Sequence, residues 1–108
     1  MIILKQPDLP AQRIVCKDAS EFEQLAEEYL HKNRVSVPHP SIANISILYD
    51  KSPGQKNNFR LSARGDWVHG NAIFYSTNNI KLTEDEADFI IRSFRQFIIT
   101  KTYLGVPR

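Results

Sequence analysis

Two segments with the hydrophobic period of a helix enclose a central run of short alternating segments. The later helix is the clearer: residues 82–105 begin with Thr83 and Glu86, which match a capping box. Acidic residues fill its first turn, where the helix dipole favours negative charge. Gly105 and Pro107 supply stop signals. Apolar residues three and four positions apart then predict one buried stripe, made of Ala87, Ile90, Ile91, Phe94, Phe97 and Ile98.

The earlier helix is predicted over residues 18–33. Asp18 is a suitable N-cap, and Glu21 three residues later gives a box-like start. Glutamates cover the side that faces solvent. The opposite side carries an apolar stripe at helical spacing, made of Phe22, Leu25, Ala26, Tyr29 and Leu30.

The remaining regular segments have the two-residue period of strands. Residues 2–4 and 13–17 read as short extended segments separated by prolines, and residues 44–50, 59–64 and 71–76 read as three more strands. Turn signals between these three predict an antiparallel meander over residues 44–77. Gly65 to Asn71 is interpreted either as a loop or as a bulge followed by a Gly-Asn hairpin turn.

The pattern predicts a single α+β domain over residues 1–108, in the order strand-strand-helix-strand-strand-strand-helix. A chain of 108 residues has the usual size of one domain, and 42% apolar residues is ordinary for a globular protein. We expect a two-layer sandwich in which a mostly antiparallel sheet carries both helices on one face.

Composition excludes several classes of protein. No apolar run approaches the ~18 residues that span a bilayer, and residues 1–10 lack the features of a secretory signal. One cysteine cannot form an internal disulfide, so a soluble cytoplasmic protein without a membrane partner is expected. The net charge is only +2, but residues 51–82 carry five Lys/Arg against one acidic residue. Basic charge is therefore concentrated in the centre of the chain.

Motifs for cofactor chemistry are missing from the sequence. The four glycines match no phosphate-binding loop, and the three histidines lack metal-ligand spacing, so neither a cofactor nor a metal is expected. Cys16 could act as a nucleophile, but its apolar neighbours favour a small core residue. The acidic run at 84–88 is explained by the start of a helix.

One stretch, residues 59–75, gathers the side chains that binding sites use. Arg60 and Arg64 share one face of the predicted strand 59–64. Arginine, tryptophan and tyrosine are enriched at protein interfaces. The solvated face of a sheet would look similar and need no function. The candidate partner-binding residues are Arg60, Arg64, Asp66, Trp67, His69 and Tyr75.

The leading hypothesis is a non-enzymatic protein-binding module. It would block or neutralise a toxin or a host factor, as bacterial immunity proteins and phage-encoded inhibitors do. One alternative is an RNA-binding protein or small ribonuclease, with Arg60 and Arg64 on phosphate and His69 as a general base or acid, near Tyr75 or Asp66. Another is a self-associating structural protein that forms a homodimer through the C-terminal helix.

The dimer alternative rests on the width of the helix's apolar face. Phe89 and Ile99 fall partly outside the predicted stripe, so they widen the apolar surface beyond what one sheet needs. Alternatively, the extra apolar surface of Phe89 and Ile99 could pack inside the protein against the first helix.

Overall fold

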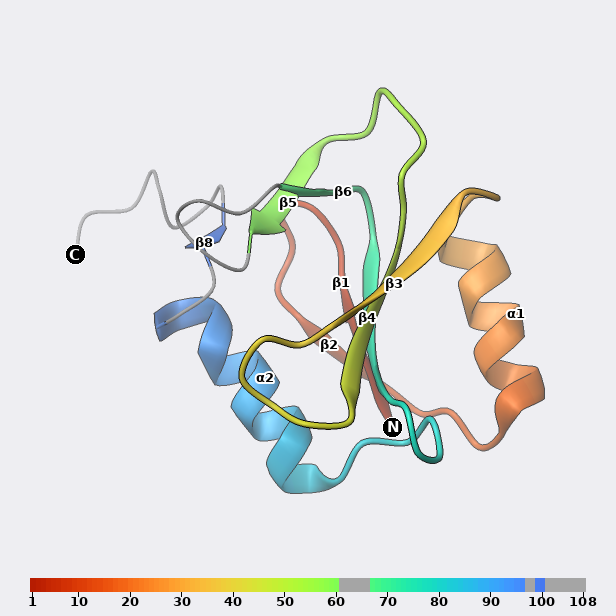
Figure 1. Ribbon diagram of the computed structural model, residues 1–108, viewed down its shortest axis with the longest axis vertical. Coiled ribbons are helices and arrows are strands. Elements are labelled where there is room, and N and C mark those ends of the chain that lie inside the picture. Colours follow the sequence, from red (N-terminus) through yellow and green to blue (C-terminus); the bar gives the residue numbers. More distant parts are fainter. Residues whose placement is uncertain (61–66, 97–98, 101–108) are drawn as a thin grey trace.

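The computed structural model describes residues 1–60, 67–96 and 99–100 (Figure 1). It confirms the α+β class and the mostly antiparallel sheet. Its elements, in chain order, are β1 (Ile2–Lys5), β2 (Gln12–Ile14), α1 (Ala19–Tyr29), β3 (Arg34–Pro38), β4 (Ile45–Asp50), β5 (Asn57–Arg60), β6 (Val68–His69), β7 (Ala72–Ser76), α2 (Glu84–Gln96) and β8 (Ile99–Thr100).

The main sheet has five strands in the order β2-β1-β7-β4-β3, and every neighbouring pair is antiparallel. β4 pairs directly with β7, so the meander predicted over residues 44–77 is wrong. Its middle strand leaves the main sheet altogether. The alternation of residues 59–64 indicates an extended segment with two different faces, but alternation does not identify a pairing partner.

That middle strand, β5, is the centre of a small sheet with the order β6-β5-β8. α2 ends at Gln96, and Ile99–Thr100 pair with β5, so the helix predicted through residue 104 is too long. Ile99 and Thr100 are both branched at Cβ, which favours extended backbone. Acidic and capping signals define the start of this helix well, whereas its end depends on a distant strand.

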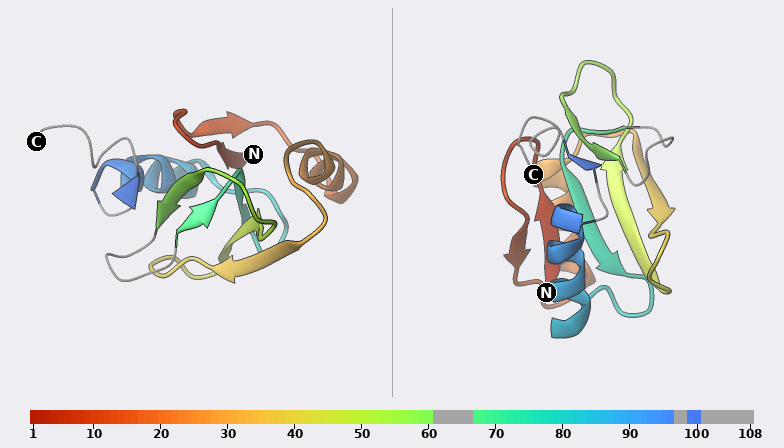
Figure 2. Two further views of the ribbon diagram at one scale, coloured as in Figure 1. Left: turned by 90° about the horizontal axis from the view of Figure 1, so that it is seen from above. Right: turned by 90° about the vertical axis from the view of Figure 1, so that its left-hand side faces the viewer.

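The two helices cover opposite faces of the main sheet, which corrects the expected two-layer arrangement (Figure 2). In β1, Ile2 and Leu4 belong to the cluster that contains α1 residues, and Ile3 belongs to the cluster that contains α2 residues. The same alternation separates Ile73 from Phe74 in β7. A strand that is apolar on both faces is typical of a sheet covered on both sides.

The α1 face is packed mainly by the predicted stripe of that helix. Ala26 and Leu30 are buried there, and Phe22, Leu25 and Tyr29 pack against the same cluster. The α2 face is covered by α2 together with the small sheet. Its buried residues are Ile3, Ile45, Ile47, Phe59, Val68, Ala72, Phe74, Leu82, Ala87, Ile90 and Phe94.

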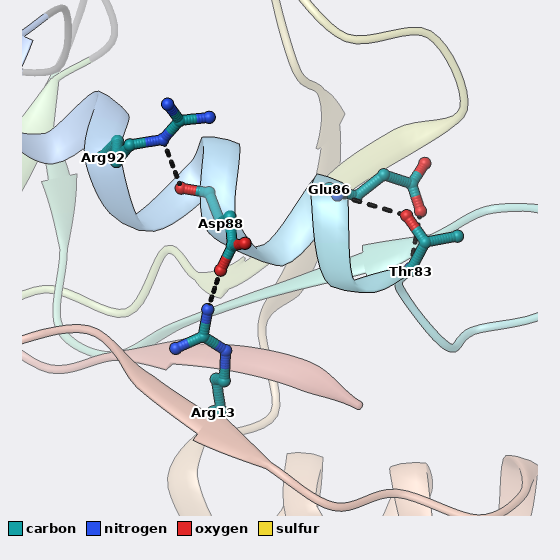
Figure 3. Close-up of polar contacts among 5 residues, drawn as sticks. All are labelled: Arg13, Thr83, Glu86, Asp88 and Arg92. Carbon is teal, nitrogen blue, oxygen red and sulfur yellow. Dashed lines mark hydrogen bonds and ion pairs between the residues drawn. The ribbon is translucent and has the colours of Figure 1, made fainter.

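Both helices begin as the sequence predicts. Asp18 accepts a hydrogen bond from the Glu21 N–H at 2.9 Å and caps α1, while the Glu21 carboxylate accepts from the Lys17 N–H. Thr83 and Glu86 form a reciprocal capping box at α2 (Figure 3).

An ion pair links the edge strand β2 to α2. Arg13 donates to the Asp88 carboxylate, and the Arg92 Nε–H donates to the Asp88 carbonyl at 3.4 Å (Figure 3). Both charged groups of the pair are about half exposed, with side-chain exposures of 44% and 51%. An exposed pair of this kind contributes little stability, about 0–1 kcal/mol.

Cys16 lies beyond the end of β2 and is buried, whereas Val15 beside it is exposed. The prediction of a core cysteine is therefore confirmed, although β2 itself is a largely exposed edge strand. Burial raises the pKa of the Cys16 thiol, and the nearby Glu21 carboxylate raises it further. Within the described residues, no helix has the length and apolar character needed to cross a membrane.

Candidate interaction surface on the small sheet

The outer face of the small sheet carries three of the six candidate residues. Phe59 and Val68 are partners in the β5–β6 ladder, and both point into the core. Because neighbouring side chains in a strand alternate, Arg60 next to Phe59 points outward. Trp67 and His69, on either side of Val68, point outward for the same reason.

Arg60 and Trp67 form a stacked pair. The guanidinium carbon of Arg60 lies 5.1 Å from the centroid of the Trp67 ring, within the range of a cation–π interaction. Both side chains are half-buried, while His69 is exposed. The Arg60 Nε is enclosed and has no hydrogen-bond partner in the described part of the chain. The pair is therefore oriented by stacking.

The structure does not bring Tyr75 into this group. β7 belongs to the main sheet, and Tyr75 points to the α1 face, where its ring lies 5.0 Å from that of Phe22. Its hydroxyl shares a 2.7 Å hydrogen bond with Ser36 Oγ on β3. His69 and Tyr75 are thus not arranged as an acid–base pair. Arg64 and Asp66 lie outside the described residues.

β5 of the small sheet contains a bulge at Asn58. Asn57 pairs with His69 and Phe59 with Val68, so Asn58 is an extra residue without a ladder partner. A bulge re-aims the inserted side chain, which explains why Asn58 and Phe59 are both buried although they are adjacent. Sequence analysis did not select Asn58, because a single asparagine before a predicted strand does not indicate a buried position in a bulge.

The buried Asn58 side chain makes hydrogen bonds through both its amide nitrogen and its amide oxygen. Its amide nitrogen donates to the carbonyls of Lys5 and Gly70, both at 2.8 Å, and its oxygen accepts from the Lys5 ammonium at 3.1 Å. The ammonium also donates to the Gln6 carbonyl and lies 5.7 Å from the centroid of the Phe94 ring. Burial lowers the pKa of Lys5 to about 8, although the Asp8 carboxylate opposes this shift.

Gly70 is where the chain passes from β6 in the small sheet to β7 in the main sheet. Its φ of +71° is in the left-handed region, and its N–H donates to the Lys56 carbonyl at 2.8 Å. β6 and β7 do not pair with each other, so the predicted Gly-Asn hairpin turn is wrong. Gly65 and Asp66, which belong to the bulge interpretation, lie outside the described residues, and the bulge at Asn58 in β5 was not predicted.

A groove lies elsewhere in the described part of the chain, between the end of α1 and the β4–β5 loop. It has a volume of about 850 Å³ and is lined by residues that include Leu30, His31, Lys32, Arg34 and Pro53. Sequence analysis did not select these residues. The available signal was Asp50 followed by Lys-Ser-Pro-Gly, because an aspartate at the start of a turn commonly organises its backbone.

The Asp50 carboxylate binds backbone N–H groups on both sides of this groove. It accepts hydrogen bonds from the Asn33 N–H at 3.1 Å and from the Ser52 N–H at 2.6 Å. Burial disfavours its charged form, but these hydrogen bonds outweigh that effect and hold the pKa of Asp50 below its ordinary value. Arg34 is already engaged with the Glu23 carboxylate at 2.8 Å, so the groove is not a strongly basic one.

Comparisons with known proteins supply no relative. A scan against protein-family models, a search of curated proteins and a search of solved structures each returned no match.

Proposed function

We propose that this protein is a binding module for another protein, and that the outer face of the small sheet is its contact surface. The Arg60–Trp67 stack is the observation that supports this most directly. Tryptophan and arginine are the side chains most often found as energetic anchors of protein interfaces. A pair that is already stacked loses less conformational freedom on binding than two independent side chains.

Charge favours a partner with an acidic surface. Lys51 and Lys56 are exposed on the loop that leads into β5, and Arg60 follows on the small sheet. Opposite charge on the partner would speed association and select against other basic surfaces. The activity proposed is that of an inhibitor or immunity-type protein in the cytoplasm, which works by covering a partner and requires no catalytic step.

The test is affinity capture from a bacterial lysate with three baits, each with and without nuclease. The baits are the wild-type protein, Trp67→Ala, and Lys17→Ala as a matched surface variant at the start of α1. We expect one protein to survive nuclease treatment with wild type and Lys17→Ala, and to be lost with Trp67→Ala. Truncation of an anchor typically costs more than about 2 kcal/mol, or roughly thirtyfold in affinity.

Two outcomes would contradict the proposal. If Trp67→Ala retains the captured protein as well as wild type does, the contact surface lies elsewhere. If the captured material is RNA and accompanying proteins disappear after nuclease, the alternative of an RNA-binding protein gains support. In that case Trp67 would serve as a stacking platform for a base.

A further inference from the structure

β3 forms one edge of the main sheet (Figures 1 and 2). In the described part of the chain, no strand pairs with its outer side. An edge strand presents unpaired backbone groups and can accept another strand. Which groups β3 presents follows from its pairing with β4.

The register shows which β3 residues bond to β4. The His39 N–H donates to the Ile45 carbonyl at 2.8 Å, and the Lys51 N–H donates to the Asn33 carbonyl at 3.0 Å. In an antiparallel ladder, hydrogen-bonding residues alternate along each strand. The odd-numbered residues 33–39 therefore direct their backbone groups toward β4, and the even-numbered residues 34–38 direct theirs outward.

Pro38 is one of the outward-directed residues. It lacks an N–H, so it removes no bond from the β3–β4 ladder but leaves the outer edge without a donor at that end. The outer donors are the N–H groups of Arg34 and Ser36. The outer acceptors are the carbonyls of Arg34, Ser36 and Pro38.

We infer that this edge binds a second copy of itself, with β3 antiparallel to β3 about a two-fold axis at Ser36. Each Ser36 N–H then donates to the other copy's Ser36 carbonyl, and each Arg34 N–H donates to the other copy's Pro38 carbonyl. All four available donors are used, over the full length of the strand. In this register only the Arg34 carbonyl, which lies opposite Pro38, lacks a donor. Registers centred closer to Pro38 would place Arg34 opposite residues beyond the end of β3 and lose its bonds.

The side chains along β3 fit the same arrangement. Val35 of each copy faces Val37 of the other, and both residues are only half-buried in the single chain. Cross-strand pairs of branched apolar side chains stabilise antiparallel sheets. Charge does not oppose this pairing, because each Arg34 is already neutralised by its own Glu23. The result is one continuous sheet running through both copies.

The experiment compares Ser36→Pro with Ser36→Ala by sedimentation over a wide range of protein concentration. Both variants lose the hydroxyl that bonds to Tyr75, but only proline removes the outward N–H. Neither removes a bond from the β3–β4 ladder. Circular dichroism of each variant checks that the fold is kept. We expect wild type and Ser36→Ala to dimerise alike, and Ser36→Pro to dimerise at least about tenfold more weakly.

Phe89→Ser serves as a second comparison, because Phe89 is half-buried on α2 and would belong to a dimer formed through that helix. A wild-type protein that stays monomeric at every concentration would overturn the inference. So would a dimer that Ser36→Pro leaves intact and Phe89→Ser abolishes. Ser36 and Phe89 lie on β3 and α2, outside the small sheet, so the result is independent of the capture experiment.

Discussion

The two faces of the main sheet are covered in different ways. One face is covered by α1, whose apolar stripe follows the helical period from end to end. The other is covered by α2 together with three short strands drawn from three parts of the chain. The first face is built from a local pattern. The second depends on contacts between residues far apart in the sequence.

The interior also differs between the two faces. On the α2 side, Phe59, Phe74 and Phe94 form a mutual aromatic cluster with ring centroids 5.3–5.7 Å apart. The charged Lys5 and the polar Asn58 are buried beside it. On the α1 side the buried residues are mainly aliphatic. The two faces therefore differ in aromatic content, whereas buried polar side chains occur on both, since Asp50 shares the α1 side of β4 with Leu48.

The largest expected effect is in the aromatic cluster. Phe74→Ala should lower the free energy of unfolding by about 3–5 kcal/mol, since it removes a fully buried ring that contacts two others. Ile73→Ala, the matched change on the α1 face of the same strand, should cost about 1 kcal/mol less. Urea unfolding of both variants measures the difference. An equal or larger loss for Ile73→Ala would remove the distinction between the faces.

Above pH 8, a gain in stability with rising pH should come from Lys5, whereas Cys16, whose thiol pKa is raised by burial, acts in the opposite direction. Its pKa falls from 10.5 to about 8 on folding because burial disfavours the charged form. Between these two values the unfolded chain holds more protons, so stability should rise with pH, by up to about 3 kcal/mol. Unfolding at pH 8 and pH 10 should show this rise in wild type and in Lys17→Met.

Lys5→Met should lack the rise, because methionine has no proton to release. Its stability relative to wild type would then be highest at pH 8 and would decline toward pH 10. A rise that persists in Lys5→Met would assign the titration to other groups.

The smallest effect on stability is expected from the N-caps, which are alike in the two helices. Thr83→Ala and Asp18→Ala each remove an N-cap side chain and should each cost about 1 kcal/mol. Thermal unfolding of the two variants tests this. A loss several times larger for one helix would show that its cap also contributes to packing.

Local patterns were sufficient for several parts of this fold. Both N-caps, both buried helical stripes as far as Phe94, and the existence of β4, β5 and β7 follow from spacing and turn chemistry. Alternation places Arg60 opposite Phe59, and Trp67 and His69 opposite Val68, but only the pairing of Phe59 with Val68 brings the three onto one surface. β3 was missed, since two prolines among residues 35–41 obscure a strand whose outer edge tolerates one of them.

Sequence alone determined both helix starts, most of the extended segments and which side chains share a face of a segment, because these depend on neighbours a few residues away. Only the tertiary structure decided that β5 leaves the main sheet, that the helices cover opposite faces, and that Tyr75 lies apart from His69. Strand pairing and layer order depend on competition among many distant contacts of similar strength. A bulge of one residue at Asn58 is enough to redirect a strand into a second sheet.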